Sequence, residues 1–383
     1  MFANSFTIER YPMRLTQRFS KPISVPAKTL LCEPPKSTNT TRTPVPQPRP
    51  LLCLFSALLF TFTAVVAHAQ EYTSIVVFGD SLSDTGNVAH LTEAKYGVRI
   101  PGPDADYTDG RFTDGDDTVP AAQNYFGVWI EQFAAMLPSK PIIKNSLDGG
   151  TDYAYGFATT GSGTGAFTFG PSDSLFVDVN NIGQQITDYL ATSPRINDKT
   201  LFVVWGGAID VLYATSPDDV IKAAFNQAIN IQRLINAGAT QFIIPNLPPL
   251  GLVPRLNGSP TTSIPATQES VLFNQILTAG LDIVHDFDRG RHLHLVQLDV
   301  FALFNQVIAS PTKYSLADVT SSSQGIPTID PDTYLFWDDL HPTTHGHNIL
   351  ALTAARVIGP PECLARLEAD CESVAARGGG GNE

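Results

Sequence analysis

Residues 74–87 read SIVVFGDSLSDTGN, and in this stretch an apolar, β-branched run ends abruptly at a glycine. The run from Ser74 to Phe78 predicts a strand that is buried on both faces of a parallel sheet. The Gly-Asp-Ser sequence after it predicts a tight turn, which would present Ser81 at the carboxyl edge of the sheet, where open α/β folds bind their ligands. A serine hydroxyl alone is a weak nucleophile. A catalytic role for Ser81 therefore requires a base and a group that orients the base.

Both groups are found near the other end of the chain, in residues 336–343, FWDDLHPT. A carboxylate three residues before a histidine in a loop can fold back and accept the imidazole Nδ1–H. That bond leaves Nε2 free to take the serine proton. Asp338 and His341 are therefore the expected orienting group and base, and Asp339 is expected to be a solvated neighbour.

With these residues in place, the chain resembles the GDSL, or SGNH, family of serine esterases and lipases. Gly79 to Leu82 spell the family signature, and Asp338-x-x-His341 matches its last block. Three further blocks match in the family's order, at 152–158 (DYAYGFA), 204–210 (VWGGAID) and 245–251 (PNLPPLG). The resemblance implies a three-layer α/β/α sandwich around a parallel sheet of about five strands in flavodoxin-like order. It also implies that Ser81, Asp338 and His341 are the catalytic residues.

Two positions depart from the family pattern. Asp152 stands where the second block usually has asparagine, at a position that is mostly structural. Ile209 stands where the third block has the asparagine whose amide the family uses in the oxyanion hole. The resemblance leaves the backbone N–H groups of Ser81 and Gly156 as the oxyanion donors. Losing one donor typically costs about 10²–10³ in turnover, so we expect a slow or specialised esterase rather than an inactive one.

The expected reaction is two-step acyl transfer from a small-molecule or lipid ester, with an acyl-enzyme on Ser81. It needs no metal and no cofactor, and no Gly-x-Gly-x-x-Gly follows a strand. Two alternatives stay open. Ile209 would also suit a catalytically impaired binding or surface protein, and an alcohol in place of water would make the chain an acyltransferase.

The first 69 residues differ in composition from the rest. They hold eight Lys and Arg against two Glu, a net charge of +6, which leaves −19 for the remainder. The Pro/Thr-rich stretch 34–50 is expected to be disordered. The apolar run 51–67, with Arg49 before it and Ala-His-Ala at 67–69, predicts a secretory signal peptide at about 49–69 and a secreted or periplasmic protein without a membrane span after cleavage. A retained membrane anchor is the alternative, and the true translation start stays open.

This composition predicts three segments: an N-terminal extension with the signal peptide (1–69), a hydrolase domain (70–360) and a C-terminal tail (361–383). The acidic remainder argues against nucleic acid as a partner, since phosphate binding needs a basic face. Cys363 and Cys371 could form a disulfide in an exported chain. The oligomeric state stays open.

Strands and helices are expected to alternate along the domain, as a parallel sheet covered on both faces requires. Strands are expected at 74–78, near Ile142, and at 201–205, 242–244 and 294–298; helices at 126–137, 181–190, 223–237, 268–287, 300–307 and 345–357. A polar stretch, 97–124, contains YTDGRF at 107–112, which resembles a loop that family members carry near the acyl site.

Overall fold

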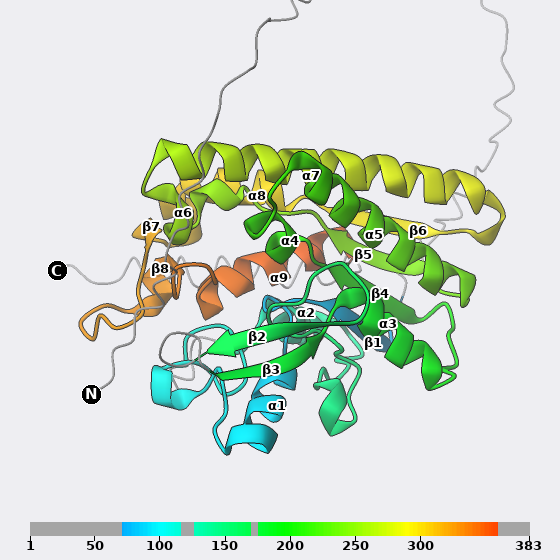
Figure 1. Cartoon of the computed structure of the whole chain (residues 1–383), viewed down its shortest axis with the longest axis horizontal. Helices are drawn as coiled ribbons and strands as arrows, with labels where there is room; N and C mark the ends of the chain where they lie inside the picture. Colours follow the sequence, from blue (N-terminus) through cyan, green and yellow to red (C-terminus); the bar gives the residue numbers. More distant parts are fainter. Residues whose placement is uncertain (1–70, 116–125, 170–174, 359–383) are drawn as a thin grey trace, which may run out of the picture. The chain divides into compact units, whose positions relative to one another are not determined.

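The computed structural model describes residues 71–115, 126–169 and 175–358. Four parallel strands form the central sheet in the order β1-β4-β5-β6 (Figure 1). The strands are β1 (Ser74–Gly79), β2 (Thr164–Phe169), β3 (Leu175–Asn180), β4 (Thr200–Trp205), β5 (Gln241–Pro245), β6 (His294–Leu298), β7 (Asp318–Ser322) and β8 (Tyr334–Phe336). The α-helices are α1 (Asn87–Tyr96), α2 (Trp129–Met136), α3 (Ile182–Ala191), α4 (Ala208–Leu212), α5 (Pro217–Asn236), α6 (Pro254–Asn257), α7 (Pro260–Phe287), α8 (Val300–Ala309) and α9 (Thr344–Ile358).

The predicted α/β class and strand order are confirmed. The second sequence block lies along the free edge of β1, where Val77 forms a parallel bridge with Asp152. Tyr153 N–H donates to the Val77 carbonyl at 2.8 Å, and Tyr155 N–H donates to that of Gly79 at 3.2 Å. This edge takes the place of the expected fifth strand. No strand forms near Ile142, whose side chain is 87% exposed and has no sheet partner among the described residues.

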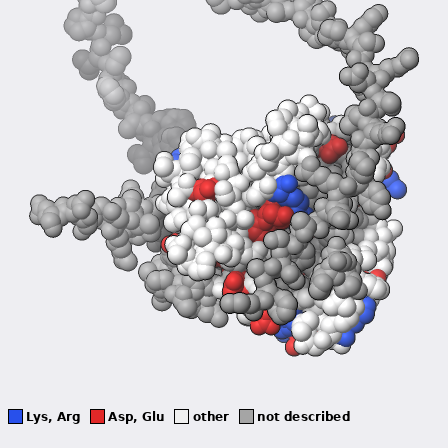
Figure 2. All heavy atoms as spheres, turned by 60° about the vertical axis from the view of Figure 1, so that its left-hand side comes forward, with Lys and Arg blue, Asp and Glu red and all other residues white. Residues whose placement is uncertain are grey.

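The side of the molecule that carries β7 and β8 comes forward in Figure 2. Its described surface is mostly uncharged, with a few acidic and basic side chains.

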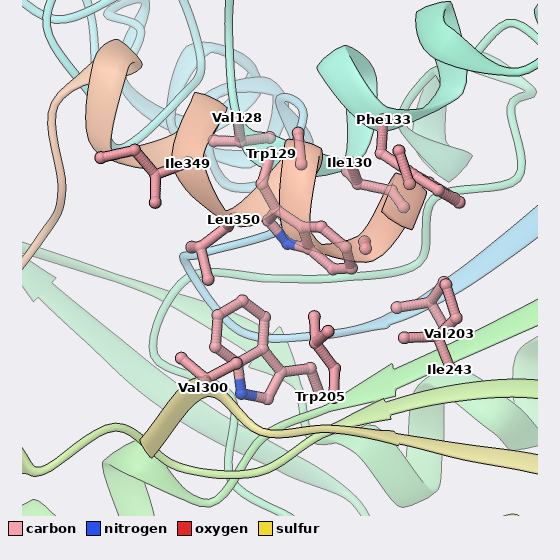
Figure 3. Close-up of a cluster of buried hydrophobic side chains, with 14 of the residues drawn as sticks. Val128, Trp129, Ile130, Phe133, Val203, Trp205, Ile243, Val300, Ile349 and Leu350 are labelled. Atoms are coloured by element: carbon pink, nitrogen blue, oxygen red, sulfur yellow. The ribbon is translucent and has the colours of Figure 1, made fainter. Parts of the chain in front are cut away.

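One face of the sheet packs on α2, α8 and α9. Alternate strand residues such as Val77, Val203 and Ile243 point to this face and are fully buried. Figure 3 shows Trp129 of α2 and Leu350 of α9 facing Trp205 of β4, with Val203 and Ile243 in the same cluster. Burying each such side chain contributes about 1.5–3 kcal/mol, so this interface fixes the loop before α9 relative to β1.

The opposite face packs on α3, α5 and α7. The intervening strand residues, including Phe78, Phe202 and Phe242, are buried here. Apolar side chains on both faces of β1, β4 and β5 are the reason that these sequence runs are largely hydrophobic. The three layers are those that the sequence predicted.

Several boundaries differ from the expectation. Helix α5 begins at Pro217, six residues earlier, because Ser216 and Asp219 form a capping box there. Helix α7 begins at Pro260, eight residues earlier, after an N-cap at Ser259. The β2–β3 hairpin was not expected. The predicted signal peptide and the Cys363–Cys371 pair lie outside the described residues.

Candidate active site

Ser81 lies in a tight turn directly after β1. Gly79 N–H donates to Gln185 Oε1 at 2.9 Å, and Gln185 Nε2 donates to the Gly79 carbonyl at 2.9 Å. These two bonds fix the end of the strand. A Cβ at Gly79 would lie 2.7 Å from the Trp205 carbonyl oxygen, so only glycine fits where β1 meets β4. The N–H groups of Ser83 and Asp84 then both donate to the Asp80 carbonyl at 3.1 Å. This turn points Ser81 toward the loop between β8 and α9.

Ser81, His341 and Asp338 form a continuous series of hydrogen bonds. Ser81 Oγ lies 2.8 Å from His341 Nε2, and His341 Nδ1 lies 2.7 Å from Asp338 Oδ2. An ionised carboxylate only accepts, so Nδ1 carries the proton and Nε2 accepts from the serine hydroxyl. The three residues that the sequence singled out are therefore brought together, across a separation of 260 positions.

The loop of residues 337–343 carries Asp338 and His341 and is called the catalytic loop below. It is closed by hydrogen bonds between its own residues. Trp337 N–H donates to the His341 carbonyl at 2.8 Å, and the N–H groups of Leu340 and His341 donate to Asp338 Oδ1 at 2.8 and 2.6 Å. Burial alone would raise the pKa of Asp338, but the charge of His341 and these hydrogen bonds outweigh it and lower the pKa to about 2. Asp338 is therefore ionised at any ordinary pH.

Asp339 is more than a solvated neighbour. Its carboxylate accepts two hydrogen bonds from Arg255, at 3.0 Å from Nε and 2.7 Å from Nη2. Its carbonyl also accepts from Arg255 N–H at 2.8 Å. This bidentate pair connects the catalytic loop to α6.

A small cavity lies beside the nucleophile. It measures about 20 Å³, little more than the space one water needs. Its lining consists of Asp80, Ser81, Leu82, Ala208, Ile209, Leu340 and His341. Ile209, the altered family position, is only 6% exposed and forms part of this wall. The position where the family has an amide donor is thus a buried apolar surface next to Ser81.

The prediction that Gly156 supplies an oxyanion donor is wrong for this structure. Gly156 N–H donates to Asp84 Oδ2 at 2.9 Å, so it is occupied by a buried carboxylate. Ser81 N–H, the other predicted donor, has no hydrogen-bond partner among the described residues. Phe157 N–H likewise has none in the described part of the chain, and Phe157 has a φ of 70°.

The Asp84 carboxylate accepts hydrogen bonds from four backbone N–H groups in all. Besides that of Gly156, these are the N–H groups of Gly86, Asn87 and Val88 at the start of α1. Burial raises the pKa of Asp84 to about 6 against the effect of these bonds. Burial and the nearby Asp84 raise the pKa of Asp152 well above its ordinary value, while its carboxylate accepts from Thr85 and Ala154. The Asp152 position is structural, as the sequence suggested.

The loop of residues 107–115 contacts the catalytic loop at several points. The Tyr107 hydroxyl donates to Asp338 Oδ2 at 2.8 Å, and the Phe112 ring lies over His341 with centroids 5.1 Å apart. The sequence predicted that 107–112 lies near the acyl site, but not these contacts. They join residues up to 231 positions apart, and no local pattern encodes them.

Among the described residues, no group of three or more His, Cys, Asp or Glu side chains is arranged to hold a metal ion. None of the helices in the described ranges is long and apolar enough to cross a membrane.

A serine, a histidine and an aspartate in series at the carboxyl edge of a parallel sheet have the arrangement of a serine hydrolase. The model of the family described as GDSL-like Lipase/Acylhydrolase matches residues 75–353, and the chain belongs to that family. The family that the sequence motifs indicated is confirmed.

Three relatives illustrate the range of the similarity. An "Uncharacterized protein in trpE-trpG intergenic region" of Pseudomonas putida is 27% identical, over 80% of this chain and 52% of that protein. "Lipase 1" of Photorhabdus luminescens is 24% identical, over 78% of this chain and 52% of the lipase. "Phosphatidylcholine-sterol acyltransferase" of Aeromonas hydrophila is 23% identical, over 80% of this chain and 96% of the acyltransferase. The chain thus spans about half the length of the first two.

Proposed function

We propose that this protein hydrolyses carboxylic esters through an acyl-enzyme on Ser81. The observation that carries the proposal is the series of two short hydrogen bonds from Ser81 through His341 to Asp338. The cavity beside Ser81 is lined in large part by apolar side chains, which suits an uncharged ester, either a small molecule or a lipid.

In the proposed reaction, Ser81 Oγ attacks the ester carbonyl while His341 Nε2 takes its proton. The ionised Asp338 stabilises the imidazolium that forms. The Ser81 N–H is the predicted donor that remains available to the tetrahedral oxyanion. Collapse breaks the C–O bond, and His341 returns the proton to the leaving alcohol. Water then attacks the acyl-enzyme with His341 as base, which releases the acid and restores Ser81.

We propose further that turnover is slow. Ile209 has no side-chain donor, and Gly156 N–H is already bonded to Asp84. Two of the three family donors are therefore missing from the site, and each such donor is typically worth about 10²–10³ in turnover.

A fluorophosphonate probe tests the nucleophile directly. We expect the parent to be labelled and Ser81→Ala to be unlabelled, with hydrolysis of p-nitrophenyl acetate and butyrate lost in parallel. Ser83→Ala is the matched control, because Ser83 lies two positions away and its hydroxyl accepts from Trp129 Nε1 rather than facing His341. A parent that is neither labelled nor active would favour a binding protein of this fold.

Acyl transfer to an alcohol is the second candidate, because the acyltransferase of Aeromonas hydrophila aligns over nearly its whole length. Adding glycerol or a sterol to the ester assay would separate the two reactions. Formation of the new ester faster than free acid would favour the acyltransferase.

We also propose that the protein is exported and cleaved near Ala69. The support is the basic flank, apolar run and small-x-small sequence of residues 49–69. N-terminal sequencing of the protein recovered outside the cytoplasm is expected to begin at Gln70; recovery of the full chain in the membrane fraction would favour an anchor.

A further inference from the structure

Tyr107 forms the one side-chain hydrogen bond to Asp338, apart from that of His341, in the described part of the chain. Its hydroxyl donates to Oδ2 at 2.8 Å, and the same oxygen accepts from His341 Nδ1 at 2.7 Å. Tyr107 is 9% exposed. Burial and the charge of Asp338 both raise the pKa of Tyr107, so the hydroxyl stays protonated and acts as donor.

The Tyr107 ring is held from the side. It packs edge to face on Trp337, the residue before Asp338, with centroids 6.1 Å apart. A backbone bridge between Tyr107 and Asp114 closes the loop, and Thr108 N–H donates to the Thr113 carbonyl at 3.0 Å. The hydroxyl therefore points at Asp338 from a rigid turn rather than from a free loop.

The same loop contacts the chain on the other side of His341. Thr113 Oγ1 donates to the Pro342 carbonyl at 3.0 Å. The Asp114 carboxylate accepts from both the N–H and the hydroxyl of Thr344, at the start of α9. The turn thus contacts Asp338 before His341, the His341 ring itself, and Pro342 and Thr344 after it. The position of the turn and that of the catalytic loop therefore depend on each other.

We propose that Tyr107 is a positioning residue of the active site, which extends the series to Tyr107–Asp338–His341–Ser81. The inference rests on the proposed function of that series. A donor to Oδ2 fixes the rotation of the Asp338 carboxylate and draws off part of its charge. It thereby sets both the orientation of His341 and the strength with which the carboxylate stabilises the imidazolium.

Tyr107→Phe tests the hydroxyl while keeping the ring against Trp337. We expect kcat for p-nitrophenyl acetate to fall about fivefold with KM unchanged, because the carboxylate loses one of the contacts that orient it. We also expect the acidic limb of the kcat/KM profile to move to higher pH by about half a unit, because Asp338 would hold a more concentrated charge beside the imidazolium.

Other ionisable groups face this series and are unchanged in the variant. Asp80 lines the cavity with His341, and Asp339 is paired with Arg255. His347 of α9 is buried, and burial together with the charge of His341 lowers its pKa to about 3. A difference between the pH profiles of parent and variant therefore reports the Tyr107 hydroxyl.

Tyr96→Phe is the matched control, since its hydroxyl donates to the Phe176 carbonyl in the hairpin at 2.9 Å and not to the site. It is expected to leave kcat and the pH profile as in the parent. In an Asp338→Asn background, Tyr107→Phe is expected to change kcat less than twofold, because the two residues act through one contact.

A measurement without turnover separates this inference from the proposed function. The Nδ1 proton of His341 is expected to give a downfield proton NMR resonance that shifts in Tyr107→Phe and disappears in Asp338→Asn. If the parent hydrolyses no ester but the resonance shifts, the proposed function is wrong and the positioning role of Tyr107 stands. If the resonance, kcat and the acidic limb all stay as in the parent, Tyr107 has only a packing role and the inference is wrong.

Discussion

Ile209 places a branched apolar side chain in the wall of the cavity beside Ser81. At the family's position an amide would donate to charge that appears only in the transition state. Ile209 is the second residue of α4, and this helix begins directly after Gly207. An asparagine there would therefore occupy the same wall, with a polar end toward the nucleophile.

For Ile209→Asn, we expect kcat for p-nitrophenyl butyrate to rise about 10-fold or more, with KM little changed, because the new donor acts in the transition state. Ile209→Val is the control, since it keeps the wall apolar and is expected to leave kcat within about twofold. A rate in Ile209→Asn at or below that of the parent would mean that another group already stabilises the oxyanion.

The juxtaposition of Ser81, His341 and Asp338 was predictable from sequence, whereas the hydrogen bond of the Gly156 N–H was not. Ser81, Asp338 and His341 each lie in a short motif whose spacing carries the chemistry. The availability of the Gly156 N–H depends on Asp84, 72 positions away, and that contact is decided by packing. The Tyr107 bond to Asp338 was beyond sequence reasoning for the same reason.

At the level of elements, α1 is connected to the serine turn through Asp84. Its N-cap is Gly86, with a φ of 128° and no side-chain bond, so the usual capping side chain is absent. Asp84 takes that role from two residues earlier and also holds Gly156. One carboxylate thereby connects the serine turn, the first helix and the second sequence block.

Asp84→Ala is expected to destabilise the protein by at least about 3 kcal/mol, because it leaves four backbone donors in a buried site without an acceptor. Urea denaturation followed by circular dichroism measures this loss. Asp219→Ala is the matched control, because Asp219 caps α5 at the exposed surface and water can replace it. A loss for Asp84→Ala no larger than for Asp219→Ala would show that water reaches the α1 cap.

Elements were predicted well where a buried strand or an amphipathic helix has clear ends. The expected strand 294–298 has the bounds of β6, and 201–205 differs from β4 by one residue. The β2–β3 hairpin was missed because it is only partly buried, so its strands lack a continuous apolar run. Helix starts at Pro217 and Pro260 were missed because the first turns are polar and apolar periodicity begins later.

At the scale of the whole molecule, buried ionisable groups, most of them carboxyls, set the response to pH. Burial raises the pKa of Asp80, Asp84, Asp114, Asp152 and Asp210. The pKa of buried Asp338 is lowered instead, because His341 pairs with it. The chain also carries a net charge of −13, so loss of further protons increases repulsion within the fold.

The contribution of Asp80 to the stability of the protein is therefore expected to fall as the pH rises from about 4.5 to 7.5. The pKa of Asp80 is 3.8 ordinarily and about 6 in the fold, so the folded state binds this proton more tightly. Such a group stabilises the fold below the unfolded pKa, and that contribution is lost as pH rises through the folded pKa. The opposite contribution of Asp338 changes between its pKa of about 2 and 3.8, below this range. Buried His347 also contributes in the opposite sense, because its pKa is about 3 in the fold and 6.5 ordinarily, and this contribution overlaps the range.

Asp80→Asn removes one of these titrations. The Asp80 carboxylate accepts from Leu82 N–H at 3.1 Å through Oδ1, and an asparagine oxygen can keep that bond. The melting temperature of the variant relative to that of the parent is expected to rise between pH 4.5 and 7.5. The difference at pH 7.5 corresponds to on the order of 2 kcal/mol. Asp282→Asn, at an exposed position on α7, is expected to keep the slope of the parent. Equal slopes in Asp80→Asn and the parent would mean that Asp80 is ionised in the fold across this range, and that its burial is compensated by groups other than a proton.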